Sequence, residues 1–255
     1  MRIEKWYLDC VKADGSGIIG YAARVGYGRL GVNLSETLSW QTDGEPARDR
    51  IALGGSLPVI SAEGIDWSSR ALGANGRWRP CLPGMAAILH QEKGGQIEWT
   101  CFSPAASARI GVTGRSYEGA GYAERLVITL PLSKLPIREL QWGRFISDSQ
   151  SCVWIRWAGP VEQSLCYHNC RPVAAMPEPA GFDWPGHRLQ LDRRIVIRSG
   201  LVSAKVAGGG RWLRLLLPAA VRNIDETKWC SAGVLTDAQG NKHSGWAVHE
   251  VAVFP

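Results

Sequence analysis

Apolar and polar residues alternate along most of this chain, in short runs without the period of an α-helix. The runs are rich in β-branched and aromatic residues and end at Gly, Pro, Asp or Asn, as antiparallel strands do. Only "AEGIDWSSRAL" and "PAAVRNIDETKW" are compatible with a helical turn or two. The predicted strands are "KWYLDCV", "GIIGYAARVGY", "RLGVNLSETLSW", "GQIEWTCFS", "RLVITLPL", "CVWIRWAG", "RRIVIRSG", "RWLRLLL" and "HSGWAVHEVAVF".

Turn signals recur at close spacing between these runs. Each of "ADGSG", "TDGEP", "EKGGQ", "AGGGR" and "DAQGN" places a Gly where a hairpin needs a positive φ. Many short strands joined by such turns predict an all-β sandwich or barrel. The Pro-containing stretch "MPEPAGFDWPGH", residues 176–187, is incompatible with a central strand and is expected to be a long loop or lid.

The two ends of the chain resemble each other. "KWYLDCVKADG" followed by "GYAARV" near the start is similar to "KWCSAGVLTDAQG" followed by "GWAVHEV" near the end. A true repeat would give two similar barrels, although hairpins draw on a small residue vocabulary and chance also explains the similarity. On the repeat hypothesis the predicted domains are residues 1–112 and residues 113–255.

Composition is that of a globular protein with one large core or two small ones, because 45% of the 255 residues are hydrophobic. Twelve Trp against four Phe is an unusual balance. Since Trp is both large and amphipathic, this balance suggests that aromatic side chains line pockets as well as fill cores. A cavity for a hydrophobic small molecule is therefore expected.

The net charge of +6 arises mainly from arginines spread singly along the chain, with no run of like charges longer than the pair Arg193-Arg194. Nucleic-acid binding needs a dense basic patch, and the sequence contains none, so no nucleic-acid partner is expected. Weak peripheral contact with an anionic membrane surface stays compatible with this charge.

Seven cysteines at irregular spacing do not form a disulfide framework, which favours reduced thiols in a cytoplasmic protein. The N-terminal "MRIEKWYLDC" enters a strand pattern at once and lacks the apolar core of a signal peptide. The longest apolar stretch, "LRLLLPAAV", is too short to span a bilayer.

The most distinctive segment is "GAGYAERLVITLPLSKLPIRELQWGRF", residues 119–145. Its Gly-Tyr-x-acid element, strand, Pro-containing turn and Leu-x-Trp-Gly-x-Phe element resemble the carotenoid hydratase (hydroxyneurosporene synthase, CrtC) and AttH-like family, which is similar to tocopherol cyclases and lipocalin-like pericyclases. The opening "WYLDCV" and the closing "SGWAVHEVAVF" resemble the edges of the same family. The resemblance implies two calycin-type, lipocalin-like antiparallel β-barrels side by side, with an apolar ligand cavity.

In the family's hydratases the motif Tyr is followed by a His and then by an Asp implicated in protonating a carbon–carbon double bond. The matching residues here are Ala123 and Glu124, so the acid is present and the His is not. Because alternate strand residues share a face, Tyr122 and Glu124 are predicted on one face, and we expect Glu124 to be a general acid in an apolar lumen, assisted by Tyr122. The alternative is a structural ion pair of Glu124 with Arg144 or with a residue near Arg125.

A second candidate set comes from "LQWGRF" and "VWIRW". Trp142, Arg144 and Trp154 are predicted to line the ligand cavity, where aromatic faces stabilise positive charge on a substrate. Barrel-sealing tryptophans with surface arginines are the alternative. His168 is added as a polar residue of the lumen, with a hydrogen-bonded structural histidine as the alternative.

"CYHNC" places Cys166, His168 and Cys170 on one face if it is a strand. The spacing is not that of a zinc motif and a fourth ligand is missing, so no metal is predicted. Asp9 and Glu36 are isolated acids in apolar strands that suit hydrogen-bond networks in the lumen. No nucleotide-binding, hydrolase or metalloprotease motif occurs in the sequence, and no cofactor is expected.

These patterns predict a cofactor-independent, acid-assisted hydratase, cyclase or isomerase of an apolar, terpenoid or polyketide-like small molecule. One alternative is a non-catalytic carrier or sensor of lipophilic ligands, for which the same barrel suffices. Another is a scaffold whose barrels are filled by side chains.

Overall fold

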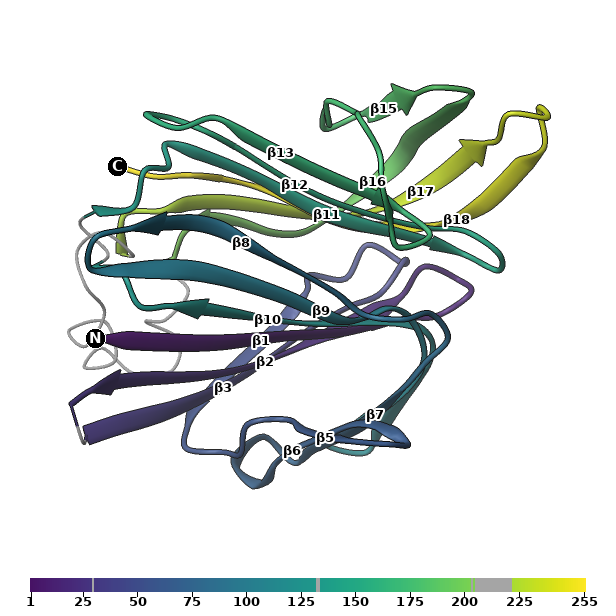
Figure 1. Cartoon of the computed structure of the whole chain (residues 1–255). Coiled ribbons are helices and arrows are strands. Elements are labelled where there is room, and N and C mark those ends of the chain that lie inside the picture. Colours follow the sequence, from purple (N-terminus) through teal and green to yellow (C-terminus); the bar gives the residue numbers. More distant parts are fainter. Residues whose placement is uncertain (29, 132–133, 203, 205–221) are drawn as a thin grey trace. The chain divides into compact units, whose positions relative to one another are not determined.

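The alternating pattern of the sequence forms two antiparallel β-sheets, each belonging to a different part of the chain (Figure 1). The structure, a computed structural model, describes residues 1–28, 30–131, 134–202, 204 and 222–255. The chain divides into two units, residues 1–135 (unit 1) and residues 136–255 (unit 2). The predicted all-β class with lipocalin-like barrels is confirmed. No helix in the described part of the chain is long and apolar enough to cross a membrane.

Unit 1 contains a ten-stranded sheet in the order β4-β3-β2-β1-β10-β9-β7-β6-β5, with β8 paired to β9. Its central strands are long, and β9 and β10 form a hairpin whose second strand returns to pair with β1. The strands are β1 (Arg2–Val11), β2 (Gly17–Tyr27), β3 (Leu30–Trp40), β4 (Arg48–Leu53), β5 (Val59–Ser61), β6 (Gly64–Ser69), β7 (Ala74–Pro80), β8 (Met85–Glu92), β9 (Gly95–Val112) and β10 (Arg115–Ile128).

The β9–β10 hairpin explains why the units divide later than the sequence suggested. The predicted boundary at residues 112/113 falls in the turn of this hairpin, and the division between the units lies between Leu135 and Pro136. β10 pairs with β9 on one side and with β1 on the other, so it cannot leave unit 1 without breaking the middle of the sheet.

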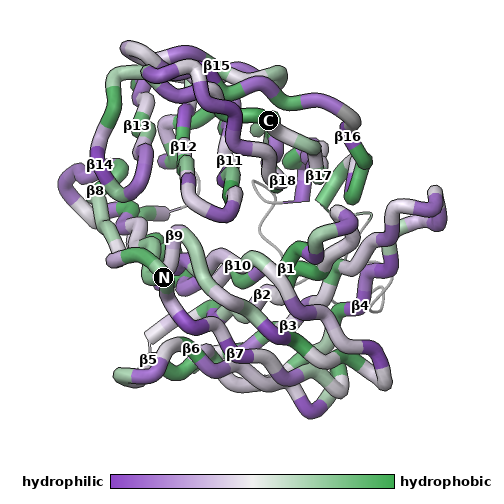
Figure 2. Tube along the Cα trace, turned by 90° about the vertical axis from the view of Figure 1, so that its right-hand side faces the viewer, coloured by the Kyte–Doolittle hydropathy of each residue, from purple (hydrophilic) through white to green (hydrophobic). Residues whose placement is uncertain are grey.

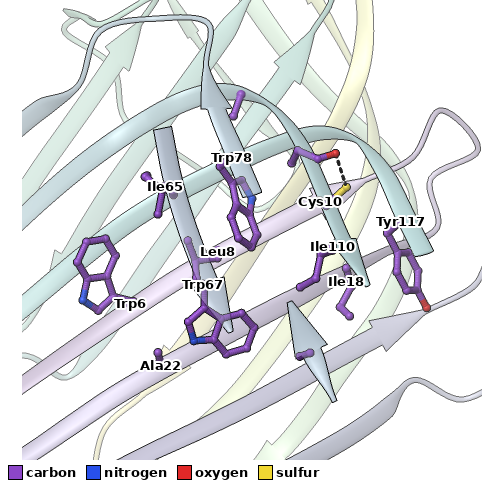
Figure 3. Close-up of a cluster of buried hydrophobic side chains, with 14 of the residues drawn as sticks. Trp6, Leu8, Cys10, Ile18, Ala22, Ile65, Trp67, Trp78, Ile110 and Tyr117 are labelled. Atoms are coloured by element: carbon purple, nitrogen blue, oxygen red, sulfur yellow. Dashed lines mark hydrogen bonds between the residues drawn. The ribbon is translucent and has the colours of Figure 1, made fainter. Parts of the chain in front are cut away.

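The interior of unit 1 is filled by large side chains (Figure 3). Trp6, Trp67 and Trp78 are each at most 3% exposed and pack with aliphatic residues of β1, β2, β6, β7, β9 and β10. Burial of this much apolar surface is the main stabilising contribution expected for the unit. These three tryptophans of unit 1 therefore fill a core, which is one of the two roles that the composition allowed.

The backbone comes very close to this core at Gly64, the first residue of β6. Its φ of 138° is unfavourable for other residues, and a Cβ there would meet the Trp78 carbonyl. Gly44 also has a positive φ, 86°, but nothing lies within 4 Å of the position of its Cβ.

These two glycines give a matched prediction for stability. We expect Gly44→Ala to cost about 1 kcal/mol through backbone strain alone, and Gly64→Ala to cost about 1 kcal/mol more through the added clash. Urea denaturation of both variants measures the difference. Equal losses would contradict the close approach at Gly64.

Unit 2 contains an eight-stranded sheet in the order β14-β13-β12-β11-β18-β17-β16-β15. The sheet curls into an arc in Figure 2, and residues of β13 and β15 meet in one buried cluster with Phe145 and Trp154. The strands are β11 (Glu139–Ser147), β12 (Ser151–Ala158), β13 (Gln163–His168), β14 (Arg171–Pro172), β15 (Gly181–Trp184), β16 (His187–Leu201), β17 (Asp225–Thr236) and β18 (Lys242–Val253).

Most predicted strands occur, with some shifts of their ends. "RWLRLLL", residues 211–217, lies outside the described residues, and "AEGIDWSSRAL" holds β6 and one short 3-10 helix, Arg70–Leu72. The predicted loop at 176–187 is only partly a loop, because it contains β15. β15 lies at the edge of the sheet, the position in which flanking prolines are tolerated.

Candidate functional site

Two Tyr-x-acid sequences meet on neighbouring strands of unit 1. Tyr7 and Asp9 lie on β1, Tyr122 and Glu124 lie on β10, and the antiparallel register places each tyrosine opposite the acid of the other strand. Tyr7 donates a hydrogen bond to Asp9 Oδ2 at 3.0 Å, and Tyr122 donates one to Glu124 Oε2 at 2.6 Å. The two tyrosine rings pack edge to face, 6.0 Å apart. We call these four residues the Tyr–acid quartet.

Trp99 adds a second donor to the quartet. It lies on β9 opposite Leu126 of β10, and its Nε1 donates a hydrogen bond to Glu124 Oε2. Tyr122 and Trp99 therefore both donate to the same carboxyl oxygen. Two donors on one oxygen fix the orientation of the carboxyl group.

Burial distinguishes the members of the quartet. Asp9 and Tyr122 are fully buried, whereas Glu124 is only partly buried. Burial, with smaller contributions from Cys101 and Glu124, raises the pKa of Tyr122 well above its usual value. The Tyr122 hydroxyl therefore stays protonated and remains a hydrogen-bond donor. Glu124 is the carboxyl group that an external molecule reaches more easily.

The quartet does not face the interior of the unit 1 barrel. Ala123, which lies between Tyr122 and Glu124, is part of the core with Trp6 and Trp78, so its two neighbours point to the opposite face of the sheet. The expectation that Glu124 faces an apolar lumen is therefore wrong for unit 1. Alternation correctly grouped Tyr122 with Glu124, but it does not indicate which face of the sheet is the inside.

Arg125 belongs to the interior side of the sheet. Its guanidinium lies 3.9 Å from a Glu4 carboxyl oxygen and over the rings of Trp6 and Phe102. The structure thus brings the two predicted catalytic residues, Tyr122 and Glu124, together, and Arg125 lies on the other face of the sheet.

The four predicted ligand-binding residues of unit 2 do not line one surface. Trp142 and Arg144 are on one face of β11, whereas Trp154 lies opposite Gly143 and therefore on the other face. His168 pairs with Cys152 of β12. Cys152 is two residues from Trp154 on the same strand, so His168 and Trp154 lie on the same face. A single cavity wall made of all four residues is wrong, since their register divides them between two faces of one sheet.

Each of these residues has a local role in packing or hydrogen bonding. Trp142 is buried, Arg144 is fully buried and donates to the Trp246 carbonyl at 2.9 Å, and Trp154 packs edge to face against Phe182 at 5.3 Å. His168 Nε2 lies 2.8 Å from Gln150 Oε1.

Sequence reasoning missed a buried ion pair beside Trp142. Lys228 of β17 is 1% exposed, forms an ion pair with Glu250 of β18, and places its ammonium group 5.6 Å from the centre of the Trp142 ring. Cross-strand pairing aligns all three residues on one face. The strand "ETKWC" gave no local signal, because the partners of Lys228 come from strands distant in sequence.

The Cys166, His168 and Cys170 group does not form on one strand face. β13 ends at His168, and Asn169 and Cys170 have positive φ in the following turn. Burial raises the pKa of Cys166 to about 11, and its thiol lies 3.6 Å from the Ala175 carbonyl. Among the residues that the structure describes, no group of three or more His, Cys, Asp or Glu side chains is arranged to hold a metal ion.

A buried histidine lies on the inner face of unit 2. His249 Nε2 is 2.9 Å from Ser231 Oγ, and its ring stacks on Trp229 with 5.2 Å between the centres. Burial, followed by the charges of Arg194 and Lys228, lowers the pKa of His249 to about 3. The imidazole is therefore neutral in the folded protein near neutral pH.

We expect the ring of His249 to remain unprotonated from about pH 8 down to about pH 5. The unfolded chain takes up this proton near pH 6.5 and the folded chain does not, so native stability decreases as the pH falls below about 6.5 towards the folded pKa. NMR titration of the ring measures this. Ser231→Ala is the control and should leave the pKa of His249 low, because burial is the main cause of the lowered pKa. A titration midpoint of His249 near 6.5 in the wild-type protein would contradict the account.

Comparison with known proteins shows similarity at the level of the fold. No family model matches the sequence, and no curated protein matches it significantly. A protein assigned as AttH from Nitrosomonas europaea aligns with 98% of this chain and 92% of its own, at a TM-score of 0.56 and 10% identity. The structure of CghA with Sch210972 aligns with 99% of this chain and 88% of its own, at a TM-score of 0.59 and 10% identity.

This chain has the fold of these two proteins. The all-β, lipocalin-like fold that the resemblance of residues 119–145 implied is thereby confirmed. A kievitone hydratase from Nectria haematococca aligns with 98% of this chain and 88% of its own, but its TM-score of 0.46, at 9% identity, is too low to support an argument. At such low identity the likeness concerns the fold, and chemistry has to be argued from the residues of this chain.

Proposed function

We propose that this protein is a cofactor-independent hydratase, cyclase or isomerase that starts its reaction by protonating an apolar substrate. The observation that supports the proposal is the Tyr–acid quartet with Trp99, in which two donors hold one oxygen of a partly buried carboxyl group. General acid catalysis needs a positioned carboxyl group whose proton faces the substrate. The shared fold with AttH and CghA is compatible with this chemistry and does not establish it.

Glu124 is the proton donor in this proposal. Tyr122 and Trp99 hold Oε2, and the proton on Oε1 adds to a carbon–carbon double bond, forming a C–H bond and a cation. Water then captures the cation in a hydratase, an internal double bond captures it in a cyclase, and loss of a neighbouring proton completes an isomerisation. Tyr7 and Asp9 support Tyr122 by packing and hydrogen bonding on β1.

The substrate class is part of the proposal. The resemblance to the carotenoid hydratase and AttH-like family favours a terpenoid or polyketide-like molecule with an isolated or conjugated double bond. Trp142 and Trp154 belong to unit 2 and lie on opposite faces of β11 and β12, so they are given no role beside Glu124 in this proposal.

Native mass spectrometry with organic extraction tests the proposal on protein purified from its own host. We expect wild type to carry the product and Glu124→Gln to retain its precursor, with a mass difference that identifies the reaction class. The same unmodified lipophile on both proteins would show a carrier in place of an enzyme. Absence of any lipophile from both would favour a scaffold.

A further inference from the structure

The free end of the β2–β3 hairpin exposes two large apolar side chains. Tyr27 and Leu30 are 78% and 81% exposed, the highest values among the exposed large hydrophobic residues in the described part of the chain. They lie opposite each other in the last cross-strand pair. Figure 1 shows this end of the hairpin in purple, at the same side of unit 1 as the N-terminus. Single exposed apolar side chains are common, but apolar residues that join into one continuous exposed surface often mark a site of interaction.

The apolar surface continues inward from the tip. Val25 and Val32 form the cross-strand pair on the same face, and Ile3 of β1 lies opposite Val25. Val32 is 46% exposed, whereas Val25 and Ile3 are half-buried. The tip therefore carries one continuous apolar face over β1, β2 and β3.

The other face of the same hairpin end is basic. Arg2 and Arg24 are exposed and line a depression of about 370 Å³, which also touches Leu30. The Arg24 guanidinium lies close to Gly31 of the neighbouring strand, where the missing side chain leaves room for it. Glu4 also lines the depression, but its carboxylate accepts a hydrogen bond from Trp6 Nε1 and lies 3.9 Å from Arg125, which offsets its charge.

We propose that the β2–β3 tip docks on the surface of an anionic lipid bilayer. Tyr27 and Leu30 enter the interface between headgroups and acyl chains, where tyrosine and aliphatic side chains are stabilised. Arg2 and Arg24 contact headgroup phosphates, and the net charge of +6 adds a general attraction to the surface. The contact is reversible, because it combines only a few apolar side chains with a few charges.

A bilayer fits this tip better than a second copy of the chain. Stable protein interfaces bury roughly 800 Å² on each partner, far more than two tip side chains and their two valine neighbours present. A bilayer needs no complementary shape, and the combination of an apolar tip with adjacent arginines matches its layered chemistry.

Vesicle co-sedimentation tests the proposal with the full chain. We expect binding to vesicles of equal parts phosphatidylcholine and phosphatidylglycerol, weaker binding to phosphatidylcholine alone, and release at high salt. Tyr27→Ser with Leu30→Ser should weaken binding roughly tenfold. The double variant Arg2→Gln with Arg24→Gln should also weaken vesicle binding, by about fivefold for each arginine removed.

Two matched double variants serve as controls. Val59→Ser with Ile60→Ser removes exposed apolar residues from β5, and Arg79→Gln with Arg115→Gln removes the same charge from other exposed positions of unit 1. Both should bind within about twofold of wild type, apart from the general effect of net charge. Circular dichroism checks that all variants fold.

Equal losses in the tip and control variants, or no binding by wild type, would overturn the proposal. A concentration-dependent dimer that Tyr27→Ser with Leu30→Ser abolishes would overturn it in favour of a second copy. None of these outcomes depends on substrate turnover, so the membrane proposal and the proposed function stand or fall separately.

Discussion

Glu124→Gln is expected to lower turnover by a factor of about 10² to 10⁴, the usual contribution of a positioned general acid. The amide keeps the shape of the side chain and an oxygen that accepts hydrogen bonds from Tyr122 and Trp99, but it has no acidic proton to give. Turnover of the precursor extracted from the variant, followed by mass spectrometry, measures the loss. Substrate affinity should change much less, because the proton is transferred in the transition state.

Glu118→Gln is the matched control for this loss. Glu118 lies on the same strand, is exposed, and pairs with Arg109 on the surface. Its replacement should leave turnover unchanged. If Glu124→Gln and Glu118→Gln have the same turnover as wild type, Glu124 is a structural acid and the barrel serves another purpose.

Trp78→Ala is expected to destabilise unit 1 by about 3 to 5 kcal/mol, the cost of removing a large buried aromatic side chain. Trp78 is fully buried in the core, and its Nε1 donates to the Asp9 carbonyl at 2.6 Å. Truncation leaves a cavity and removes this buried hydrogen bond, which adds to the cost. The midpoint of urea denaturation, at an unchanged slope, measures the effect.

Val59→Ala is the control for Trp78→Ala. Val59 is 64% exposed, and its truncation should change stability by no more than about 0.5 kcal/mol. A loss of less than about 1 kcal/mol for Trp78→Ala would mean that the interior of unit 1 has room for a ligand. The filled core in Figure 3 would then need revision.

The strands were predictable because alternation and turn residues are local properties. The pattern of "GIIGYAARVGY" gives β2 from Gly17 to Tyr27 with no error at either end. The same reasoning placed Tyr122 and Glu124 on one face, which their hydrogen bond bears out. It could not say which face is inside, because β10 has buried residues on both faces.

Partners from distant strands were not predictable. Trp99 and Tyr7 join Glu124 only through the register of β9 and β1 with β10, and register is set by the packing of the whole sheet. One signal was available, since "YLD" and "YAE" share the Tyr-x-acid pattern. When two strands with a Tyr-x-acid pattern pair antiparallel in this register, each tyrosine lies opposite the acid of the other strand. This holds whichever face of the sheet is inside.

The register also explains why the residues grouped in unit 2 lie on two faces and why the unit division differs from the predicted boundary. Trp142 and Trp154 were grouped from similar local sequences, but β11 and β12 pair so that Trp154 lies opposite Gly143 and not opposite Trp142. The boundary at 112/113 was placed at a turn, and a turn inside a hairpin looks the same in sequence as a turn between domains.

Transfer of a solvent-derived proton to carbon is the most direct test of the proposed chemistry. The precursor retained by Glu124→Gln is incubated with wild-type protein in D₂O, and the product is analysed by mass spectrometry after back-exchange in water. The account predicts one deuterium that does not exchange, on the carbon that Glu124 protonates, and none with Glu124→Gln. Product without carbon-bound deuterium, or equal labelling by both proteins, would contradict the role of Glu124 as the proton donor.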